Sequence, residues 1–499
     1  MEPPGFGSFD DGSQVSRDTP GFMQGDTHST RHPSQPRDGA HRLTSGVERF
    51  LQIYNRGIFV LAVLAVGSAL FMTIAAMPAQ AQSDGSWWDG IRGFGTPSFS
   101  DRPRNERPQA KPDTLNDLRT GPVPWRSDEM LQFIDRAIGQ YRQIAEKGGW
   151  PKVPGNRMIR PGDDDERVPA LRRRLRATGE LKGSNSGFED YNFDSALEEA
   201  VRRFQDRHGL RTSGRVDQST LAALNVSVED RINQLQLNYE RIAELLRQPL
   251  EDRYVLVNVP AFQLEAVERF EVVQRHRIIA GRVGRDTPSL KSTIRALNFF
   301  PSWRVPDSVA RLDVFPRLVK EPQYLEQEKI RVVLGDFNGP EIDATSIDWS
   351  QADASRIKLR QDPGPQNALG LVRIDMQNEH GVYMHDTPLK ALFDQRERAF
   401  SAGCVRVQDV FKLVEWIARL EPGWEAPGQV DAVIESGMAL DVTLTRPVPV
   451  YFTYITAWAE ENGLVQFRRD IYNRDGQNPQ GMEVVDADAP PPPSPGLAP

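Results

Sequence analysis

The spacing of apolar residues changes at Arg253, and this change limits the possible folds more than any other feature. Before it, apolar residues recur at helical spacing, as in segments 128–147 and 227–247. After it, the helical period gives way to short segments such as RYVLVNV (253–259) and the alternating FQLEAVE (262–268), which predict strands. The chain is therefore expected to be a multidomain α+β protein, with helices first and a β-rich body after them.

The helical part divides into two components. Segments 127–159 and 227–250 each contain one long amphipathic helix, and together they are expected to form a scaffold. Segment 160–226, between them, contains three short helical patterns and predicts a small three-helix domain. The β-rich body spans 251–476 and is interrupted at 307–320 by a helical pattern with Val309, Leu312 and Val319 on its inward face.

The first strongly apolar run, 57–77, contains no charged residue and is long enough to cross a hydrocarbon core about 30 Å thick. Basic residues precede it, so the polar leader 1–56 is expected to be disordered and cytoplasmic, with the remainder exported to the periplasm. The triplet Ala79-Gln80-Ala81 also fits a signal peptidase site. Segment 57–81 is therefore either an inner-membrane anchor or a cleaved signal.

Two other segments are expected to lack a fold. Segment 82–126 is rich in proline without apolar periodicity, which predicts a linker, and 477–499 contains the run PPPPSP, which predicts a disordered tail. The net charge of −8 at pH 7 argues against a nucleic-acid-binding protein, because such proteins normally carry a basic surface.

Cys404, in the stretch FSAGCVRV, is the only cysteine among 499 residues. In an exported chain it has no partner for an internal disulfide, so it is either buried and inert or kept for its reactivity. His385 stands at the end of a strand-like run, and a loop and return can bring it to Cys404 as a base. The residues alone leave open a nucleophile and base, or a buried hydrophobe and a structural histidine. No zinc-ligand spacing occurs, so we expect no metal and no cofactor.

MHDTP and SAGCVR together resemble the catalytic motif of YkuD-domain L,D-transpeptidases, in which a histidine precedes a Ser/Thr-x-Gly-Cys-hydrophobic-Arg/Asn segment. Other segments are similar to the large, YcbB-like branch, and 160–226 resembles a PG_binding_1-type peptidoglycan-binding domain. Many relatives carry a histidine where this chain has Ala402, which leaves His385 as the only base. The motif residues are His385, Ser401, Gly403, Cys404, Val405 and Arg406, and the further similar segments are 281–288, 298–306, 360–370, 454–458 and 467–472.

The resemblance implies an enzyme that cross-links peptidoglycan stem peptides. Cys404 would attack the carbonyl between diaminopimelate and the terminal D-alanine, and the amine of a neighbouring diaminopimelate would take the acyl group from the thioester. His385 would act as base and then as acid, with its tautomer held by a carbonyl such as that of Asp386. The amides of Gly403 and Cys404 would hold the oxyanion.

The resemblance also implies substrate-binding candidates, each with packing as an alternative: Tyr383, Ser401, Arg406, Trp303 and Asn367. Segment 302–335 fits the position of the lid insert of this branch. The expected partners are stem peptides and glycan strands, and the inner membrane if the N-terminal segment is uncleaved. Segment 160–226 would bind glycan strands or brace the catalytic domain. An L,D-carboxypeptidase and a non-catalytic wall-binding adaptor remain alternative functions.

Overall fold

The computed structural model describes residues 115, 117–119, 121–183 and 190–476. All of them belong to one unit of the chain, Arg104–Pro499. The predicted leader, the segment 57–81, most of the predicted linker and the tail 477–499 lie outside the described residues. Among the helices that are described, none combines the length and the apolar character that a membrane span requires.

The central element is a nine-stranded sheet that closes on itself. Its order is β10-β3-β11-β9-β8-β4-β12-β1-β2, and β2 also pairs with β3, so the pairings form a ring. The alternating pattern after Arg253 is thereby confirmed as strands. The bounds are β1 Arg253–Asn258, β2 Gln263–Glu268, β3 Glu271–Gly281, β4 Leu290–Phe299, β8 Val372–Met376, β9 Met384–His385, β10 Ala399–Ser401, β11 Val405–Val407 and β12 Leu440–Thr453.

The main hydrophobic core fills the inside of this sheet. Side chains such as Val257, Leu297 and Ile374 are fully buried there, together with the apolar face of α10 (Val410–Ala418). A second helix, α11 (Gln429–Ser436), packs beside α10. Each fully buried aliphatic side chain contributes about 1.5–3 kcal/mol. The core therefore gives β9 and β11 a rigid setting.

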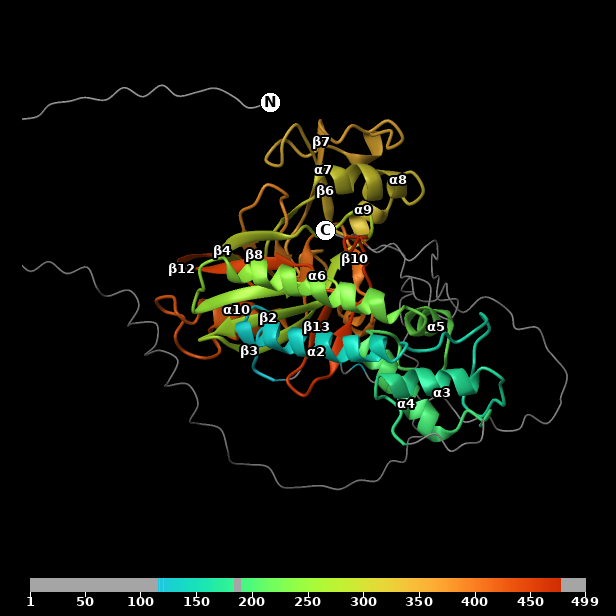
Figure 1. Ribbon diagram of the computed structural model, residues 1–499. Coiled ribbons are helices and arrows are strands. Elements are labelled where there is room, and N and C mark those ends of the chain that lie inside the picture. Colours follow the sequence, from blue (N-terminus) through green and yellow to red (C-terminus); the bar gives the residue numbers. More distant parts are fainter. Residues whose placement is uncertain (1–114, 116, 120, 184–189, 477–499) are drawn as a thin grey trace, which may run out of the picture. The chain divides into compact units, whose positions relative to one another are not determined.

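The two predicted scaffold helices are present as α2 (Asp128–Glu146) and α6 (Val228–Leu246), which lie side by side (Figure 1). Each begins at a serine, Ser127 or Ser227, whose hydroxyl accepts a hydrogen bond from the first turn. Their apolar faces share a second core with the outer side of β1 and β12. The short hairpin β13 (Ala457–Ala459) and β14 (Val465–Phe467) completes this core.

The small helical domain consists of α3 (Val168–Ala177), α4 (Ser195–Arg207) and α5 (Gln218–Leu224), which share a core of their own. The end of α4 is tied to β14. Nη1 of Arg207 donates to the carbonyl of Val465 over 3.2 Å, and the ring of His208 stacks on Phe467 at 5.3 Å. One face of the domain thus braces the body of the protein.

The insert after β4 is larger than the sequence pattern predicted. It has its own three-stranded sheet, in the order β5-β7-β6, and its own hydrophobic core. Because β7 returns to pair with both β5 and β6, the insert extends to Gln361 rather than ending near residue 335. Its strands are β5 Trp303–Arg304, β6 Ile330–Leu334 and β7 Ile357–Gln361.

The helical stretch of the insert is broken by a π-turn. It runs as α7 (Asp307–Val309), η2 (Ala310–Val314) and α8 (Phe315–Leu318), with α9 (Tyr324–Gln327) after it. Val309 is buried as predicted, but Leu312 is 55% exposed and Val319 is 54% exposed, so their inward placement was wrong. Pro316 has no N–H for the Leu312 carbonyl, and the wider turn changes which side chains face inward.

The end of the predicted linker belongs to the folded body. Trp125 is fully buried, and its backbone N–H donates to the carboxylate of Glu265 over 3.1 Å. The guanidinium of Arg126 donates to three carbonyl oxygens at the end of α6, including that of Pro249 over 2.7 Å. Single anchoring side chains such as these produce no periodic pattern, which is why segment 82–126 was predicted to be linker throughout.

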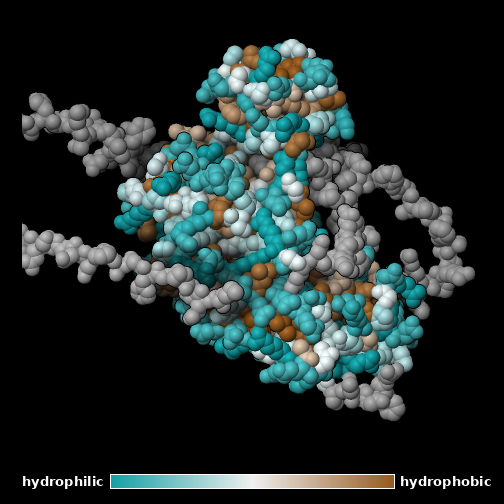
Figure 2. Space-filling view, turned by 45° about the horizontal axis from the view of Figure 1, so that its top comes forward, coloured by the Kyte–Doolittle hydropathy of each residue, from teal (hydrophilic) through white to brown (hydrophobic). Residues whose placement is uncertain are grey.

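The exposed face of the molecule in Figure 2 is mainly hydrophilic, and its hydrophobic residues occur in small groups. Scattered apolar residues of this kind are usual on protein surfaces. Most of the apolar residues that form the sequence patterns are therefore buried in the separate cores of the sheet, the scaffold, the insert and the helical domain.

Candidate active site

His385 ends strand β9, and Cys404 lies immediately before the neighbouring strand β11. β9 and β11 pair in parallel, with Met384 opposite Val405 and His385 opposite Arg406. Residues opposite each other share a face of the sheet, and so do residues two apart along a strand. His385 and Arg406 therefore share a face of the sheet. Tyr383 and Cys404 stand directly before these two strands, and the Cys404 thiol interacts with Tyr383 and with the charge of Arg406. That His385 serves Cys404 as a base stays a prediction.

His385 is held in one tautomer. Its Nδ1 donates a hydrogen bond to the carbonyl oxygen of Asp386, as the sequence predicted, so Nε2 carries the lone pair. Nε2 is buried without a hydrogen-bond partner among the described residues. Burial, assisted by the nearby Arg406 charge, lowers the pKa of His385 to about 3. The imidazole is thus neutral at pH 7, with a free acceptor nitrogen.

Cys404 rests as a neutral thiol. It is 8% exposed, and burial raises the pKa of its thiol to about 11. Hydrogen bonds from the backbone N–H and the hydroxyl of Tyr383 act in the opposite direction, as does the charge of Arg406. The pair is therefore a thiol and an imidazole, not a preformed thiolate and imidazolium. Such a pair needs proton transfer to the base as the sulfur attacks.

Arg406 is a buried cation that forms no ion pair with any residue that the structure describes. It is 1% exposed, and its Nε and Nη1 have no hydrogen-bond partner within the described part of the chain. Burial lowers the pKa of its guanidinium to about 10. The negative charge of Cys404 in its thiolate form has the opposite effect and raises this pKa. An unpaired buried charge costs stability. The guanidinium is thus available to negative charge that develops at Cys404.

Tyr383 interacts with both the Cys404 thiol and the His385 ring. Its ring meets the His385 ring edge-on at 5.7 Å, and the guanidinium of Arg373 lies 5.5 Å from the Tyr383 ring. Burial raises the pKa of its hydroxyl well above the usual range, so the proton stays available for the Cys404 sulfur. The indole of Trp303 lies beside the same hydroxyl and is itself fully buried. Sequence patterns did not single out Arg373, because it follows the ordinary alternation of a strand.

The loop before Cys404 is closed by Ser401. The Ser401 hydroxyl accepts from the N–H of Gly403 over 3.1 Å and donates to the carbonyl of Cys404 over 2.5 Å. The Gly403 amide therefore already has a partner, which corrects the prediction that it holds an oxyanion. Of the two backbone amides predicted to hold the oxyanion, that of Cys404 remains a candidate. The hydroxyl of Ser401 likewise serves the loop and not a substrate.

Asn367 has a structural role that corrects its prediction as a substrate-binding residue. It is 1% exposed, and its Nδ2 donates to the carbonyls of Pro301 and Asp362 over 3.1 and 2.9 Å. Its Oδ1 accepts from the N–H of Leu369 over 2.8 Å. The side chain therefore joins the two ends of the insert and has no free group for a ligand.

The insert contacts the loop region around Cys404 directly. Asp313, in η2, pairs with Arg282 over 2.6 Å and with Arg285 over 3.2 Å, and both arginines follow β3. Ala402, at the position that is histidine in many relatives of the family named above, packs against the core of the insert. The core of the insert therefore occupies the space beside Ala402.

The closed sheet with its helices is an α+β domain, and a buried thiol and a buried imidazole lie at two of its neighbouring strands. Residues 252–450 match the family model YkuD, described as "L,D-transpeptidase catalytic domain", and residues 164–224 match PG_binding_1, described as "Putative peptidoglycan binding domain". These two matches confirm the resemblance to an L,D-transpeptidase catalytic domain and to a PG_binding_1 domain that was seen in the sequence, and the YcbB-like branch stays a prediction.

A protein of Haemophilus influenzae named "Putative L,D-transpeptidase" is 29% identical over 262 residues, which is 52% of this chain and 52% of that protein. The match therefore spans about half of the relative's length. Among solved structures, L,D-transpeptidases from Stackebrandtia nassauensis and Xylanimonas cellulosilytica are 13% and 14% identical. Each match covers 60% of this chain and 96% or 98% of the other, with TM-scores of 0.23 and 0.16, and carries no weight for the fold.

Proposed function

We propose that this protein is a peptidoglycan L,D-transpeptidase that works through a thioester on Cys404. The observation that carries the proposal is the parallel pairing of β9, which ends at His385, with β11, which begins directly after Cys404, inside the residues that match the L,D-transpeptidase catalytic-domain model. The neutral thiol and the free Nε2 of His385 have the protonation states that general-base activation requires.

In the first half-reaction, the Cys404 sulfur attacks the carbonyl between diaminopimelate and the terminal D-alanine of a tetrapeptide stem. Nε2 of His385 takes the thiol proton, and the developing oxyanion accepts a hydrogen bond from the Cys404 N–H. The imidazolium then returns the proton to the departing amine of D-alanine. A thioester remains, and the guanidinium of Arg406 stabilises the negative charge that passes through the site.

In the second half-reaction, the side-chain amine of a diaminopimelate in a neighbouring stem attacks the thioester. His385 takes a proton from this amine and returns it to the sulfur, so that the two stems are joined and the thiol is restored. The full burial of His385 and the contact of the insert with the loop favour an amine over water, because bulk water is kept from the thioester. This supports cross-linking rather than L,D-carboxypeptidase activity.

The setting of the reaction is proposed from the sequence. The apolar segment 57–81 would direct the folded body to the periplasm, as an inner-membrane anchor or as a cleaved signal. The domain at 160–226 would bind glycan strands through a face that the bracing contacts of α4 leave available. In this arrangement, the protein acts in cell wall biogenesis on peptidoglycan.

The product of the reaction tests the proposal. The full chain is incubated with disaccharide tetrapeptides, and the muropeptides are separated and weighed. The expected result is a dimer joined between two diaminopimelate residues, with one free D-alanine per bond, which Cys404→Ala abolishes. Tripeptides without dimers would indicate a carboxypeptidase, and binding to sacculi without turnover would indicate an adaptor; either result would contradict the proposal.

A further inference from the structure

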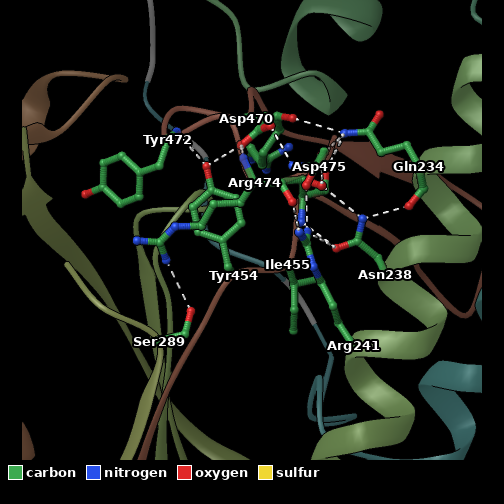
Figure 3. A network of polar contacts seen from close by, with 12 residues as sticks. Gln234, Asn238, Arg241, Ser289, Tyr454, Ile455, Asp470, Tyr472, Arg474 and Asp475 are labelled. Carbon is green, nitrogen blue, oxygen red and sulfur yellow. Dashed lines mark hydrogen bonds and ion pairs between the residues drawn. The ribbon is translucent and has the colours of Figure 1, made fainter. Parts of the chain in front are cut away.

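A polar network joins α6 to the C-terminal segment 454–475. Nδ2 of Asn238 donates to the Thr456 hydroxyl over 2.9 Å, and Nη1 of Arg241 donates to Asp475 over 2.6 Å. Asn238, Arg241 and Asp475 are seen together in Figure 3. The Thr456 hydroxyl in turn donates to Asp475 over 2.6 Å. These contacts fix the segment to the scaffold helix.

Asp470 folds the end of this segment into a defined turn. Its carboxylate accepts from the Tyr454 hydroxyl over 2.6 Å and from the N–H groups of Arg474 and Asp475, each over 2.8 Å. The Tyr454 hydroxyl accepts from the N–H of Tyr472 over 2.8 Å, and the two tyrosine rings stack at 5.7 Å. The turn therefore fixes the direction of Tyr472, which Figure 3 shows beside it.

Tyr472 points its hydroxyl into the loop between β3 and β4. The hydroxyl donates to the carbonyl of Gly281 and accepts from the N–H of Thr287 over 3.3 Å. Thr287 is fully buried. Its own hydroxyl accepts from the N–H of Gly281 over 2.9 Å and donates to the carbonyl of Gly403 over 2.8 Å. The chain of contacts thus ends on the residue before Cys404.

The last of these bonds acts on the peptide group that carries the Cys404 amide. The carbonyl of Gly403 and the N–H of Cys404 belong to one planar peptide unit, so anchoring the oxygen also fixes the direction of the N–H. Gly403 has a φ of 125°, which side-chain-bearing residues rarely adopt. The backbone preference of Gly403 alone therefore does not fix the orientation of this peptide group. Hydrogen bonds from other residues, such as that of Thr287, must fix it.

We infer that Thr287 is a positioning residue that holds the Gly403–Cys404 peptide so that the Cys404 N–H faces the reacting carbonyl oxygen, and that Tyr472 holds Thr287 in place. For its chemistry, this inference rests on the proposed function of the Cys404 site. Tyr472 lies beyond residue 450, where the match to the catalytic family model ends. The working site therefore includes a C-terminal segment outside the matched domain.

The single cysteine of the chain gives a readout that does not depend on activity. Full-length protein labelled with ¹⁵N only in cysteine has one backbone amide signal, that of Cys404. Thr287→Val removes the hydroxyl and should move this signal, while Thr287→Ser, which keeps the hydroxyl, should leave it close to its wild-type position. Tyr472→Phe should move it in the same direction as Thr287→Val.

Two replacements serve as matched controls because they remove other buried or half-buried hydroxyls from the same sheet. Thr453→Val removes a hydrogen bond to the carbonyl of Val257, and Tyr451→Phe removes one to Glu251. Both should leave the Cys404 signal unchanged. If Thr287→Val does not fold, Tyr472→Phe decides the question, because it leaves the Thr287 hydroxyl in the chain.

Acylation kinetics with a carbapenem supply the second readout. Thr287→Val should lower the maximal acylation rate about 10- to 100-fold without changing the half-saturating concentration, and Thr287→Ser should stay within about threefold of wild type. A Cys404 signal that neither Thr287→Val nor Tyr472→Phe moves, or equal loss of rate in Thr453→Val, would overturn the inference. If wild type is not acylated at all, the proposed function fails, and the amide signal still decides on positioning.

Discussion

His385 and Arg406 lie opposite each other on β9 and β11, and a buried cation thus stands beside a buried neutral imidazole. This relationship explains why the pKa of His385 is low, since burial and the Arg406 charge both disfavour the protonated form. It also gives the site a positive charge next to the thiol, at a cost to folding stability.

Arg406→Met should separate activity from stability. Removing the cation should lower the acylation rate by about 100-fold, because the charge on the sulfur and oxyanion loses its partner. The free energy of unfolding should stay the same or rise by about 1–4 kcal/mol, because an unpaired buried charge is lost. Denaturant unfolding and acylation kinetics on the same preparations check both values.

Arg126→Met is the matched control for this variant. Arg126 is as buried as Arg406, but its guanidinium is satisfied by carbonyl oxygens and Glu251. Its removal leaves these acceptors unpaired and should lower the free energy of unfolding by about 3–5 kcal/mol. Equal destabilisation by both variants would show that Arg406 has a purely structural role.

The pH dependence of thiol reactivity should show that Cys404 is not a preformed thiolate. With its pKa raised to about 11, the rate of alkylation by iodoacetamide should keep increasing with pH between 7 and 9, without a plateau. Because the chain has one cysteine, the label reports on Cys404 alone, and Cys404→Ser is the blank. A plateau already reached below pH 7 would indicate a thiolate–imidazolium pair instead.

Stability should fall in acid partly through His385. Its pKa is about 3 in the folded protein and 6.5 when unperturbed, so the unfolded chain binds more protons between these values. The contribution of His385 is therefore complete above pH 6.5 and is lost as the pH falls towards 3, at up to about 1.4 kcal/mol per pH unit. Denaturant titrations of wild type and His385→Asn at several pH values measure the difference.

The comparison between the two proteins isolates His385 from the other buried histidines, His208 and His276, whose pKa values burial also lowers. His385→Asn should have the shallower dependence on pH. A replacement of the exposed His380 by Asn provides the control for the substitution itself. Identical slopes for wild type and His385→Asn would contradict the buried, neutral state of His385.

The contact between Asp313 and the two arginines Arg282 and Arg285 should limit access to Cys404. Asp313→Asn removes the charge that holds the insert against the loop after β3. Loss of a partly exposed ion pair changes the free energy only modestly, so alkylation of Cys404 should become faster by about 2- to 10-fold. Glu341→Gln breaks an ion pair with Arg331 within the insert and is the control. Unchanged alkylation in Asp313→Asn would show that the insert does not limit access.

The sequence supplied much of the fold because the relevant patterns are local. The helices α2 and α6 follow an apolar period that burial on one face produces, and β1 to β3 are short runs of strand-forming residues. The resemblance also identified the two matched domains, the catalytic one from the motif around Cys404 and His385 and the smaller one from segment 160–226. The contact of His385 with the Asp386 carbonyl was likewise implied by the resemblance.

The remaining features depend on contacts that no local pattern records. The extent of the insert is set by β7, which returns to pair with β5 and β6. The use of the Gly403 amide by Ser401 requires the loop geometry, and the role of Thr287 requires two segments that are distant in sequence. A sequence pattern can suggest that such residues belong to the site, but it does not show which atoms remain free.

The most direct test of the central claim is the intact mass of the protein during turnover. The full chain is mixed with a disaccharide tetrapeptide donor in the absence of an acceptor amine, quenched in acid and weighed. The account predicts an adduct equal to the donor minus D-alanine, located on the peptide that contains Cys404 and absent from Cys404→Ala. D-alanine release that continues in Cys404→Ala, or an adduct on another residue, would contradict it.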